Sequence, residues 1–410
     1  MRSRLINLGM LVTMSAVMSL SIWPTKAEAI LIESDYFSDD LLFPTPEPVR
    51  QQVAFWEVIF QKYPSTTVLI HDSHDLTKVI DIIDFKRLKN GRKATKRQRD
   101  RMARGYLKRY RKALRNLKKH KHKAIKYGDI ERRLFHAYNK SSDGLSRLLS
   151  GSVTLRAQAG LADTFIEAAK RARRYLPEME RIFASYGLPK KLTRLVFVES
   201  MFRSDAVSKV GASGMWQFMP ATAKKFLYIS RLVDERNSPF KATRAAAQLL
   251  SENFRELRSW PLAVTAYNHG REGMKRASRA LNTQDMGEII ENYSSRTFGF
   301  ASRNFYGELL AAANTYQHLL AHNPALFTIK PLDVQSVILT KPISVASLLD
   351  AASLPEKELR YLNPCITDRA FKRPSKSNLP EFFEIFVPSE IEPRLARALQ
   401  HSDAKKIARR

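Results

Sequence analysis

The stretch that decides the interpretation of this chain is residues 188–202, LPKKLTRLVFVESMF. Within it, Glu199 falls on the same helical face as Leu192 and Leu195, because the three are separated by steps of three and four residues. A carboxyl group on an apolar helix face either pairs with a cation or keeps its proton through a raised pKa. A raised pKa suits a general acid at neutral pH. Glu199 is therefore the candidate catalytic acid, and an ion pair with one of the many Arg or Lys residues is the alternative.

Two further motifs follow Glu199 in the chain. Ser208 lies nine residues after it, and residues 211–222, GASGMWQFMPAT, and 266–270, AYNHG, come later. The side-chain amide of Gln217 can donate to and accept from sugar hydroxyl or acetamide groups. The candidate substrate-binding residues are Ser208, Gln217, Met219, Tyr267, Trp216 and Asn268. The sequence leaves Trp216 open between core packing and a sugar platform, and it favours a structural role for Asn268 at the end of a helix that Gly270 caps.

These motifs resemble those of the lytic murein transglycosylases, in particular their soluble-transglycosylase-type (SLT) domain. The family pattern is Glu-Ser-x-Phe, a later Ser, Gly-Ala-x-Gly-x-Trp-Gln-Phe-x-Pro-x-Thr and Ala-Tyr-Asn-x-Gly, and residues 176–317 follow it in order. The chain departs from the pattern at Arg203-Ser204, where an Asn-Pro or Asp-Pro pair is usual. The resemblance implies a lysozyme-like helical catalytic domain that acts on peptidoglycan without a cofactor.

The resemblance also implies the reaction. The family cleaves the β-1,4 bond between N-acetylmuramic acid and N-acetylglucosamine and leaves a 1,6-anhydromuramoyl end. It implies Glu199 as acid and then base, Ser208 and Gln217 near the acetamide, Met219 as an apolar wall and Tyr267 close to the glutamate. Asp205, the nearest later acid, would point to another side of the helix, so the second catalytic role is assigned to the substrate acetamide. A hydrolytic lysozyme-type muramidase and a non-catalytic peptidoglycan-binding or scaffold protein remain alternatives.

The sequence predicts a mainly α protein with five parts. A signal peptide is expected over residues 1–29, with cleavage after Ala29, because a basic start precedes an apolar run and small residues. Helical periodicity and composition then predict an N-terminal region at 30–150, the catalytic domain at 151–325, a small α+β module at 331–390 and a basic helix or tail at 391–410. The module resembles a degenerate LysM repeat, a glycan-binding unit. In the N-terminal region, residues 53–60 and 76–85 are expected to be helices and 67–70 a strand.

Charge and cysteine content limit the partners. The chain has 69 Lys and Arg against 40 Asp and Glu, and residues 86–133 alone hold 22 cations and three acids. This basic segment has apolar residues near helical spacing, which predicts an amphipathic helix. Its cationic face is either simply solvated or contacts an acidic polymer or a membrane surface. Nucleic acid is not expected, because the protein is predicted to be exported to the periplasm.

The candidate metal ligands are few. Cys365 is the one cysteine of the chain, which excludes a multi-cysteine zinc site. No cysteine stands directly after the predicted cleavage point at Ala29, so a lipoprotein is not expected. The pairs His71-Asp72 and His74-Asp75 are more typical of loop residues before a helix than of metal ligands. No metal is therefore assigned.

Overall fold

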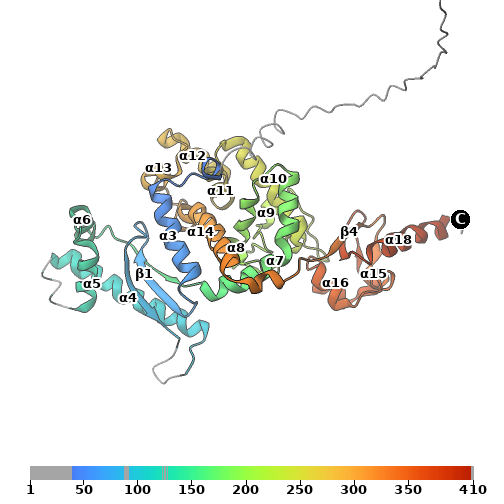
Figure 1. Ribbon diagram of the computed structural model, residues 1–410, viewed down its shortest axis with the longest axis horizontal. Helices are drawn as coiled ribbons and strands as arrows, with labels where there is room; N and C mark the ends of the chain where they lie inside the picture. Colours follow the sequence, from blue (N-terminus) through green and yellow to red (C-terminus); the bar gives the residue numbers. More distant parts are fainter. Residues whose placement is uncertain (1–38, 87–91, 122, 124–125, 127, 408–410) are drawn as a thin grey trace, which may run out of the picture.

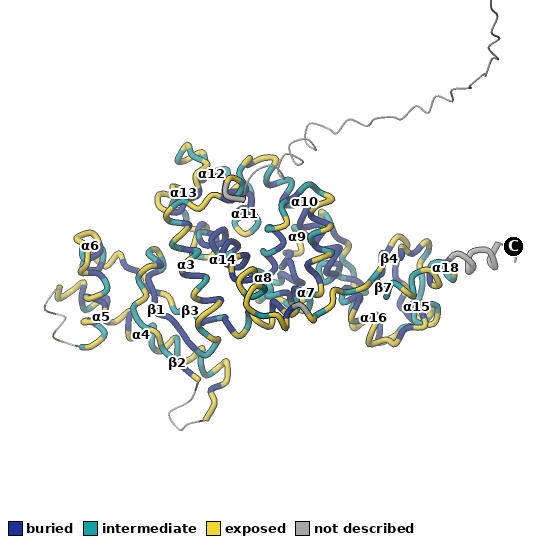
Figure 2. Tube along the Cα trace, viewed as in Figure 1, coloured by how far each residue is buried: buried dark blue, intermediate teal, exposed yellow. Residues whose placement is uncertain are grey.

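The computed structural model describes residues 39–407 except 87–91, 122, 124–125 and 127, so the predicted signal peptide lies outside the described residues. The described part is mainly helical, with three small sheets and three clusters of buried side chains. The largest cluster fills the central helical body, where dark blue buried segments concentrate in Figure 2. No helix among the described residues combines the length and the apolarity that crossing a bilayer requires.

The central body is built from helices that pack around the largest cluster (Figure 1). They are α3 (Glu47–Gln61), α7 (Ala162–Ser185), α8 (Leu195–Ser200), α10 (Pro239–Leu257), α11 (Trp260–His269) and α14 (Phe300–His322). Shorter elements complete it: α2 (Asp39–Leu42), η3 (Lys190–Arg194), α9 (Pro220–Ala223), η4 (Glu235–Asn237), α12 (Arg271–Leu281), α13 (Met286–Asn292) and η5 (Pro324–Thr328). Apolar positions three and four apart predict a helix at 239–257, and α10 occupies this span.

Two sequence expectations about these helices are corrected. Apolar spacing predicts two helices at 165–175 and 176–186, with Pro177 in a first turn, but residues 162–185 form the single helix α7 with Pro177 inside it. Buried apolar side chains on the inner face of α7 hold the backbone helical there. Apolar spacing also predicts a helix at 189–202, but this segment starts as the 3₁₀ turn η3 and is α-helical only from Leu195 to Ser200.

Helix α3 belongs to the central body although it comes from the N-terminal region. It packs along α14, which begins about 240 residues later. The close approach depends on Gly307, since a Cβ atom there would lie 2.7 Å from Cβ of Gln52. Phe55, Trp56 and Ile59 enter the same cluster as the buried residues of α7, α8, α10, α11 and α14. The central hydrophobic cluster therefore joins α3, near the start of the described chain, to α14, which ends at His322.

A three-stranded antiparallel sheet lies beside the body, in the strand order β2-β1-β3. Its strands are β1 (Thr67–Asp72), β2 (Val79–Asp84) and β3 (Leu155–Ala159). The expectation of a helix at 76–85 is wrong. The sequence pattern of a short apolar run does not distinguish a helix from a strand. Here Val79, Ile80 and Ile82 are β-branched, which favours a strand, and hydrogen bonding to β1 makes this segment the strand β2.

The two faces of this sheet contact different cores. On β1, Leu69 joins the central cluster, whereas Val68 and Ile70 face the N-terminal cluster under α4 (Lys96–His120), α5 (Asp129–Tyr138) and α6 (Ser142–Ser150). Helix α4 starts at a capping box between Thr95 and Gln98. The predicted amphipathic helix is thus confirmed over residues 96–120, a shorter span than the basic segment.

The C-terminal module consists of short strands and helices around the second cluster. It contains β4 (Val334–Ile338), β5 (Ile343–Ser344), α15 (Val345–Ala352), α16 (Glu356–Leu362), α17 (Asp368–Lys372), η6 (Pro374–Lys376), β6 (Asn378–Leu379), β7 (Glu384–Pro388) and α18 (Glu392–Ile407). Strands β4 and β7 pair antiparallel. The buried Asn363 amide bonds both backbone groups of Phe386, which ties the end of α16 to β7. An ion pair between Arg244 and Glu384 and a ring contact between Phe240 and Phe386 hold the module against α10.

Candidate active site

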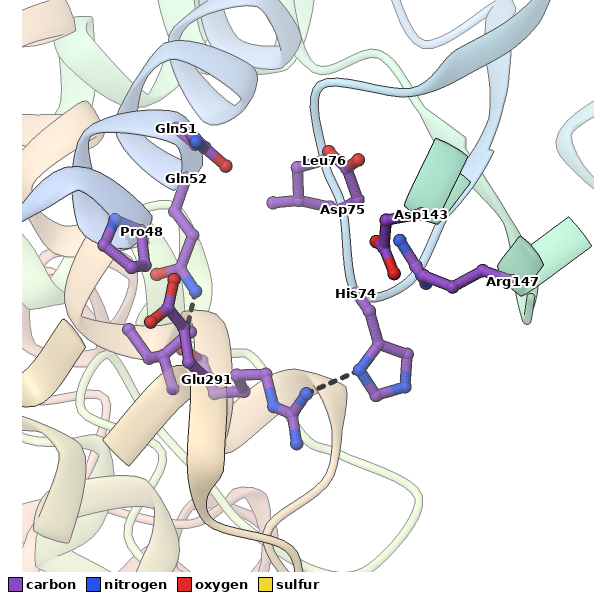
Figure 3. A pocket seen from close by; sticks show the side chains of 11 residues that line it. Pro48, Gln51, Gln52, His74, Asp75, Leu76, Asp143, Arg147 and Glu291 are labelled. Carbon is purple, nitrogen blue, oxygen red and sulfur yellow. Dashed lines mark hydrogen bonds between the residues drawn. The ribbon is translucent and has the colours of Figure 1, made fainter. Parts of the chain in front are cut away.

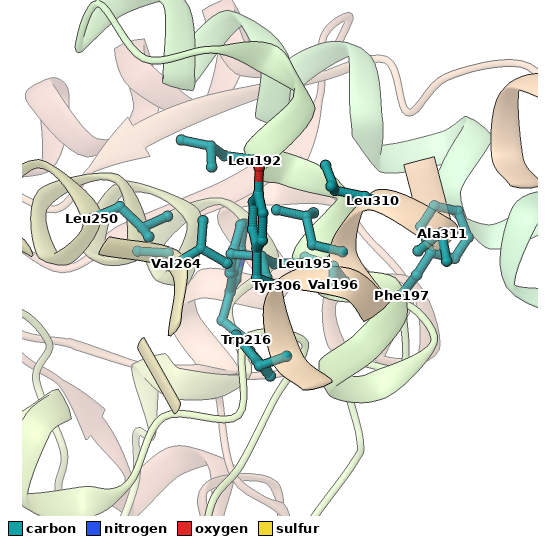
Figure 4. Packing of buried hydrophobic residues seen from close by; sticks show 14 of the residues in the cluster. Leu192, Leu195, Val196, Phe197, Trp216, Leu250, Val264, Tyr306, Leu310 and Ala311 are labelled. Carbon is teal, nitrogen blue, oxygen red and sulfur yellow. The ribbon is translucent and has the colours of Figure 1, made fainter. Parts of the chain in front are cut away.

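Helix α8 carries Glu199 at its C-terminal turn. Leu195, Val196 and Phe197 are fully buried and anchor the helix in the central cluster, as Figure 4 shows. The Phe197 ring stacks on Phe165 of α7, with ring centroids 4.5 Å apart. Glu199 itself is only partly exposed. The inner face of a very short helix is therefore fixed by packing while its last turn presents one carboxyl group.

The backbone turns sharply just after the glutamate. Met201 and Phe202 both have positive φ, 53° and 58°, a region that costs energy for residues with a side chain. Phe202 is buried against Phe197, and the guanidinium of Arg171 on α7 donates two hydrogen bonds, of 3.1 and 2.9 Å, to the Met201 carbonyl oxygen. These contacts stabilise a strained turn that determines where α8 ends.

The environment of Glu199 keeps its proton on. Burial, and secondly the nearby carboxyl group of Glu308, raise the pKa of Glu199 to about 8. The Glu199 carboxyl has no ion pair or hydrogen bond with any other described residue. The alternative of a simple ion pair is thereby excluded for the described part of the chain. At neutral pH this group is a neutral acid that can donate a proton.

Tyr267 lies beside the glutamate, at the end of α11. Its hydroxyl donates a 2.8 Å hydrogen bond to the Trp216 carbonyl oxygen. Burial, and then the proximity of Glu199, raise the pKa of Tyr267 well above its usual value, so the phenol stays neutral. Its ring lies between Phe218 and Phe305, with centroids 6.0 and 6.5 Å away. The tyrosine expected near Glu199 is therefore in electrostatic contact with it.

Gln217 sits in a loop held in an unusual conformation. Its φ is 49°, and its amide nitrogen donates to the carbonyl oxygens of Ala206 (3.1 Å) and Gly214 (2.8 Å). Both donors are thus used inside the loop, which leaves the amide oxygen as the group available to a ligand. Gly214, with φ of 78°, approaches the backbone of Arg236 so closely that a Cβ would lie 1.8 Å from its carbonyl oxygen. Packing of the loop against Arg236 therefore requires glycine at position 214.

Arg236 braces the same loop from below. Its guanidinium donates to the carbonyl oxygens of Gly211 (2.7 Å) and Phe218 (3.2 Å) and pairs with Asp234 at 2.7 Å. Ser208 stabilises the loop from within, since its hydroxyl accepts a hydrogen bond from the backbone of Ala212. The loop that carries Gln217 is therefore rigid, as substrate-positioning loops need to be.

The remaining predicted residues divide into exposed and buried ones. Met219 is 42% exposed and is available as an apolar wall. Trp216 is fully buried, donates to the Thr243 hydroxyl and stacks on Phe183. Of the two roles that the sequence left open for Trp216, the structure therefore supports core packing and not a sugar platform. Asn268 accepts a hydrogen bond from Ser302 and links α11 to α14, in keeping with a structural role.

Glu308 on α14 is a residue that the sequence reasoning missed. Helix α14 packs against α8, and burial raises the pKa of Glu308 to about 8, as it does for Glu199. Asp205, the acid that the sequence did consider, is exposed and pairs with Arg203. The site therefore has a second carboxyl group within electrostatic reach of Glu199, whereas the sequence reasoning considered only Asp205 for that role. No local motif marks it, because only the packing of α14 on α8 brings it close.

Arg156 of β3 connects the three-stranded sheet to α14, the helix that carries Glu308. Its guanidinium lies 4.0 Å from the centroid of the Phe300 ring at the start of α14. The positive charge of Arg156 lowers the pKa of Glu308, opposing the larger effect of burial. Arg156 is also within electrostatic reach of Arg111 on α4.

His71 and His74, to which the sequence analysis assigned no metal, lie away from Glu199. His74 and Asp75 line a pocket of about 410 Å³ between α3, α6 and α14, shown in Figure 3. His74 Nδ1 accepts from Arg303 at 2.6 Å, and His71 is buried with Nδ1 next to the Asp72 carbonyl oxygen. No group of three metal-ligating side chains occurs in the ranges that the structure describes.

Comparisons with known proteins found a family model, curated relatives and a solved structure that are similar to this chain. Residues 182–290 match the family model described as transglycosylase SLT domain. Over 180 residues the chain is 27% identical to membrane-bound lytic murein transglycosylase D of Escherichia coli K12, and to the same protein of strain O6:H1. Each match covers 43% of this chain and 39% of the relative, so the chain spans well under half of their length. A solved structure of an inactive mutant of lytic transglycosylase Slt from Pseudomonas aeruginosa is 19% identical, with a TM-score of 0.31, over 52% of this chain and 37% of that one.

Proposed function

We propose that this chain, which carries a transglycosylase SLT domain, is a peptidoglycan lytic transglycosylase. Its reaction cleaves the β-1,4 bond between N-acetylmuramic acid and N-acetylglucosamine and leaves a 1,6-anhydromuramoyl end. The observation that carries the proposal is Glu199, a carboxyl group inside the matched segment that is neutral at pH 7 and lacks a counter-ion among the described residues. Protonation of a leaving oxygen requires a neutral carboxylic acid. Tyr267, which is within electrostatic reach of Glu199, bonds the loop that carries Gln217.

In the mechanism, Glu199 acts twice. It first gives its proton to the glycosidic oxygen, and the bond from that oxygen to C1 of the muramoyl residue breaks while the substrate acetamide oxygen stabilises C1. Glu199, now a carboxylate, takes the proton from the O6 hydroxyl as O6 bonds to C1. Water is not consumed. The amide oxygen of Gln217 is suited to accept the acetamide N–H, and Met219 provides apolar contact for the sugar ring.

The decisive experiment is digestion of purified peptidoglycan followed by mass spectrometry of the soluble products. We expect wild type to release muropeptides that lack one water relative to hydrolysis products, and Glu199→Gln to lose this release by at least about a thousandfold. Asp205→Asn, which changes an exposed acid near the same turn, is the matched control and should retain activity. Full activity of Glu199→Gln would refute the assignment.

A hydrolytic muramidase is the second candidate, and Glu308 is the observation that favours it. Hydrolysis uses two carboxyl groups, and Glu308 supplies a second one in electrostatic contact with Glu199. The same digest separates the two functions. Reducing-end products that disappear in Glu308→Gln would establish hydrolysis, whereas anhydro products that persist in Glu308→Gln would exclude a catalytic role for this group.

The proposal also includes export to the periplasm with cleavage after Ala29. It rests on the sequence of residues 1–29 and is tested by N-terminal sequencing of the protein purified from periplasmic extract.

The C-terminal module is proposed as a LysM-like glycan-binding unit, supported by the order β4-α15-α16-β7. Binding of residues 331–410, fused to an inert carrier, to peptidoglycan sacculi tests it.

A further inference from the structure

Helix α4 presents an unusually dense array of positive charge. Eleven of its Lys and Arg residues are exposed: Lys96, Arg97, Arg101, Arg104, Lys108, Arg109, Arg111, Lys112, Arg115, Lys118 and Lys119. Asp100 is the only acid of the helix. None of the eleven cations forms an ion pair with another described residue. At 1.5 Å per residue, the 25-residue helix displays this charge over about 37 Å.

The array works against the stability of the helix that carries it. Arg104, Lys108 and Lys112 follow one another at four-residue steps, where like charges repel. Lys96 and Arg97 occupy the first turn, at the positive end of the helix dipole, and no acid balances them there. The fold retains α4 because Tyr110, Leu114 and Leu117 are buried in the N-terminal cluster. Unrelieved repulsion on a firmly packed helix points to a partner that supplies the negative charge.

A pocket lies along the same face. Arg111, Arg115 and Lys118 line one side of a hollow of about 330 Å³, and residues 151 and 153–155 line the other. No carboxylate lines it. Gly151 makes room for the cationic side, since a Cβ there would lie 2.6 Å from Cδ of Lys118. The volume and the three cations suit a single anionic group of a larger ligand.

The geometry argues against a membrane as the partner. Amphipathic helices that bind bilayers insert their apolar face, but the apolar face of α4 is already buried against β1 and β3. None of the large hydrophobic side chains that are exposed in the described residues lies on α4. The exposed face of α4 is convex and has one small pocket beside it. A flexible polymer with separate anionic groups fits such a surface better than a flat membrane does.

The position of α4 relative to the candidate active site indicates which polymer this is. Arg111 of the pocket is within electrostatic reach of Arg156, and Arg156 is within reach of Glu308, which neighbours Glu199. Leu155, the residue before Arg156 on β3, lines the pocket. Helix α4 packs on β3, and Arg156 of β3 contacts Phe300 at the start of α14, the helix that carries Glu308 and packs on α8. The sheet thus attaches the basic helix to the helices of the candidate site, so the anionic polymer expected at Glu199 is the candidate ligand of the basic face.

We propose that the basic face of α4, with the pocket of Arg111, Arg115 and Lys118, binds the carboxylate-bearing peptide stems of the peptidoglycan strand whose sugars lie at Glu199. This inference rests on the proposed function and adds a preference for peptide-bearing over peptide-free strands. The cations hold the strand by charge, so binding weakens as added salt screens the interaction.

The test measures binding, not catalysis. In the Glu199→Gln background, so that the substrate stays intact, cosedimentation with purified sacculi is compared for the parent and for the triple variant Arg111→Gln, Arg115→Gln, Lys118→Gln. We expect the triple variant to bind peptide-bearing sacculi about tenfold or more weakly and with less dependence on NaCl. Sacculi stripped of their stems by an amidase should bind both proteins alike. Because no turnover is needed, loss of the proposed activity and failure of this inference are distinguished.

The matched control removes the same charge elsewhere. Arg255, Arg276 and Arg279 are exposed on α10 and α12, away from α4 in Figure 1, and their change to Gln should leave binding unaltered. Neutralisation on α4 relieves repulsion, so the triple variant should melt no lower than the parent. Equal binding by parent and triple variant, an equal loss in the control, or parent binding to acidic phospholipid vesicles or duplex DNA but not to sacculi would overturn the proposal.

Discussion

At the scale of single residues, the site depends on a carboxyl group that the fold keeps neutral. In the unfolded chain the pKa of Glu199 is 4.5, and in the folded protein it is about 8. Below pH 4.5 the group is protonated in both states. As the pH rises towards 8 the unfolded chain loses this proton while the folded protein keeps it, so the free energy of unfolding falls with pH. The acidic function thus carries a stability cost at neutral and alkaline pH.

This cost predicts that Glu199→Gln is more stable than wild type in a pH-dependent way. The variant removes the titration, so its free energy of unfolding should exceed that of wild type by about 1–3 kcal/mol at pH 9 and by about zero at pH 4. The estimate is reduced from the full shift because the side chain is partly exposed. Urea unfolding at pH 4, 6.5 and 9 measures it. A difference that does not change with pH would contradict the assigned pKa.

At the scale of elements, the end of α8 is set by a strained turn and by one arginine of α7. Arg171→Met removes the two hydrogen bonds to the Met201 carbonyl and keeps most of the aliphatic packing. We expect a loss of about 1–2 kcal/mol in stability and a fall in kcat of about tenfold with little change in KM, because the turn positions Glu199. Product release from peptidoglycan and thermal melting are the measurements.

The control for this prediction lies on the same turn. Arg203 pairs with Asp205, and both side chains are mostly exposed, so Arg203→Met should change stability by less than about 0.5 kcal/mol and leave kcat near wild type. If Arg171→Met and Arg203→Met behaved alike, the turn would have no special role in positioning the glutamate.

The same scale shows what the sequence could predict and where it failed. The motif residues Glu199, Gln217 and Tyr267 are local signals, and the structure brings Glu199 and Tyr267 into electrostatic contact. Glu308 was missed because nothing near it in the sequence relates it to Glu199, and only the packing of α14 on α8 does. Trp216 was ambiguous because an indole ring serves a core and a sugar equally well until its burial is known. Strand β2 was mistaken for a helix because a short apolar run lacks a decisive period.

At the scale of the whole molecule, the packing of α3 against α14 joins the first long helix of the central body to its last one. Gly307→Ala would place a Cβ 2.7 Å from Cβ and Oε1 of Gln52, whose backbone-bound amide on α3 cannot easily move away. We expect a loss of about 1–3 kcal/mol from overpacking. Gly105→Ala is the control, since the same change in α4 meets no atom within 4 Å. There the helix should gain about 0.5–1 kcal/mol.

A double-mutant cycle decides whether the contact between α3 and α14 is the cause. Gln52→Ala alone removes one hydrogen bond and costs about 1 kcal/mol, but in the Gly307→Ala background it also removes Oε1 and Cδ, two of the three Gln52 atoms that the new methyl group meets, and leaves only Cβ. The double variant should therefore be more stable than the sum of the single effects by at least about 1 kcal/mol in urea unfolding. Because α14 also carries Glu308 and packs on α8, Gly307→Ala should lower the rate of product release, and Gln52→Ala should restore part of it. Additive stabilities would mean that α3 tolerates the methyl group and does not fix the position of α14.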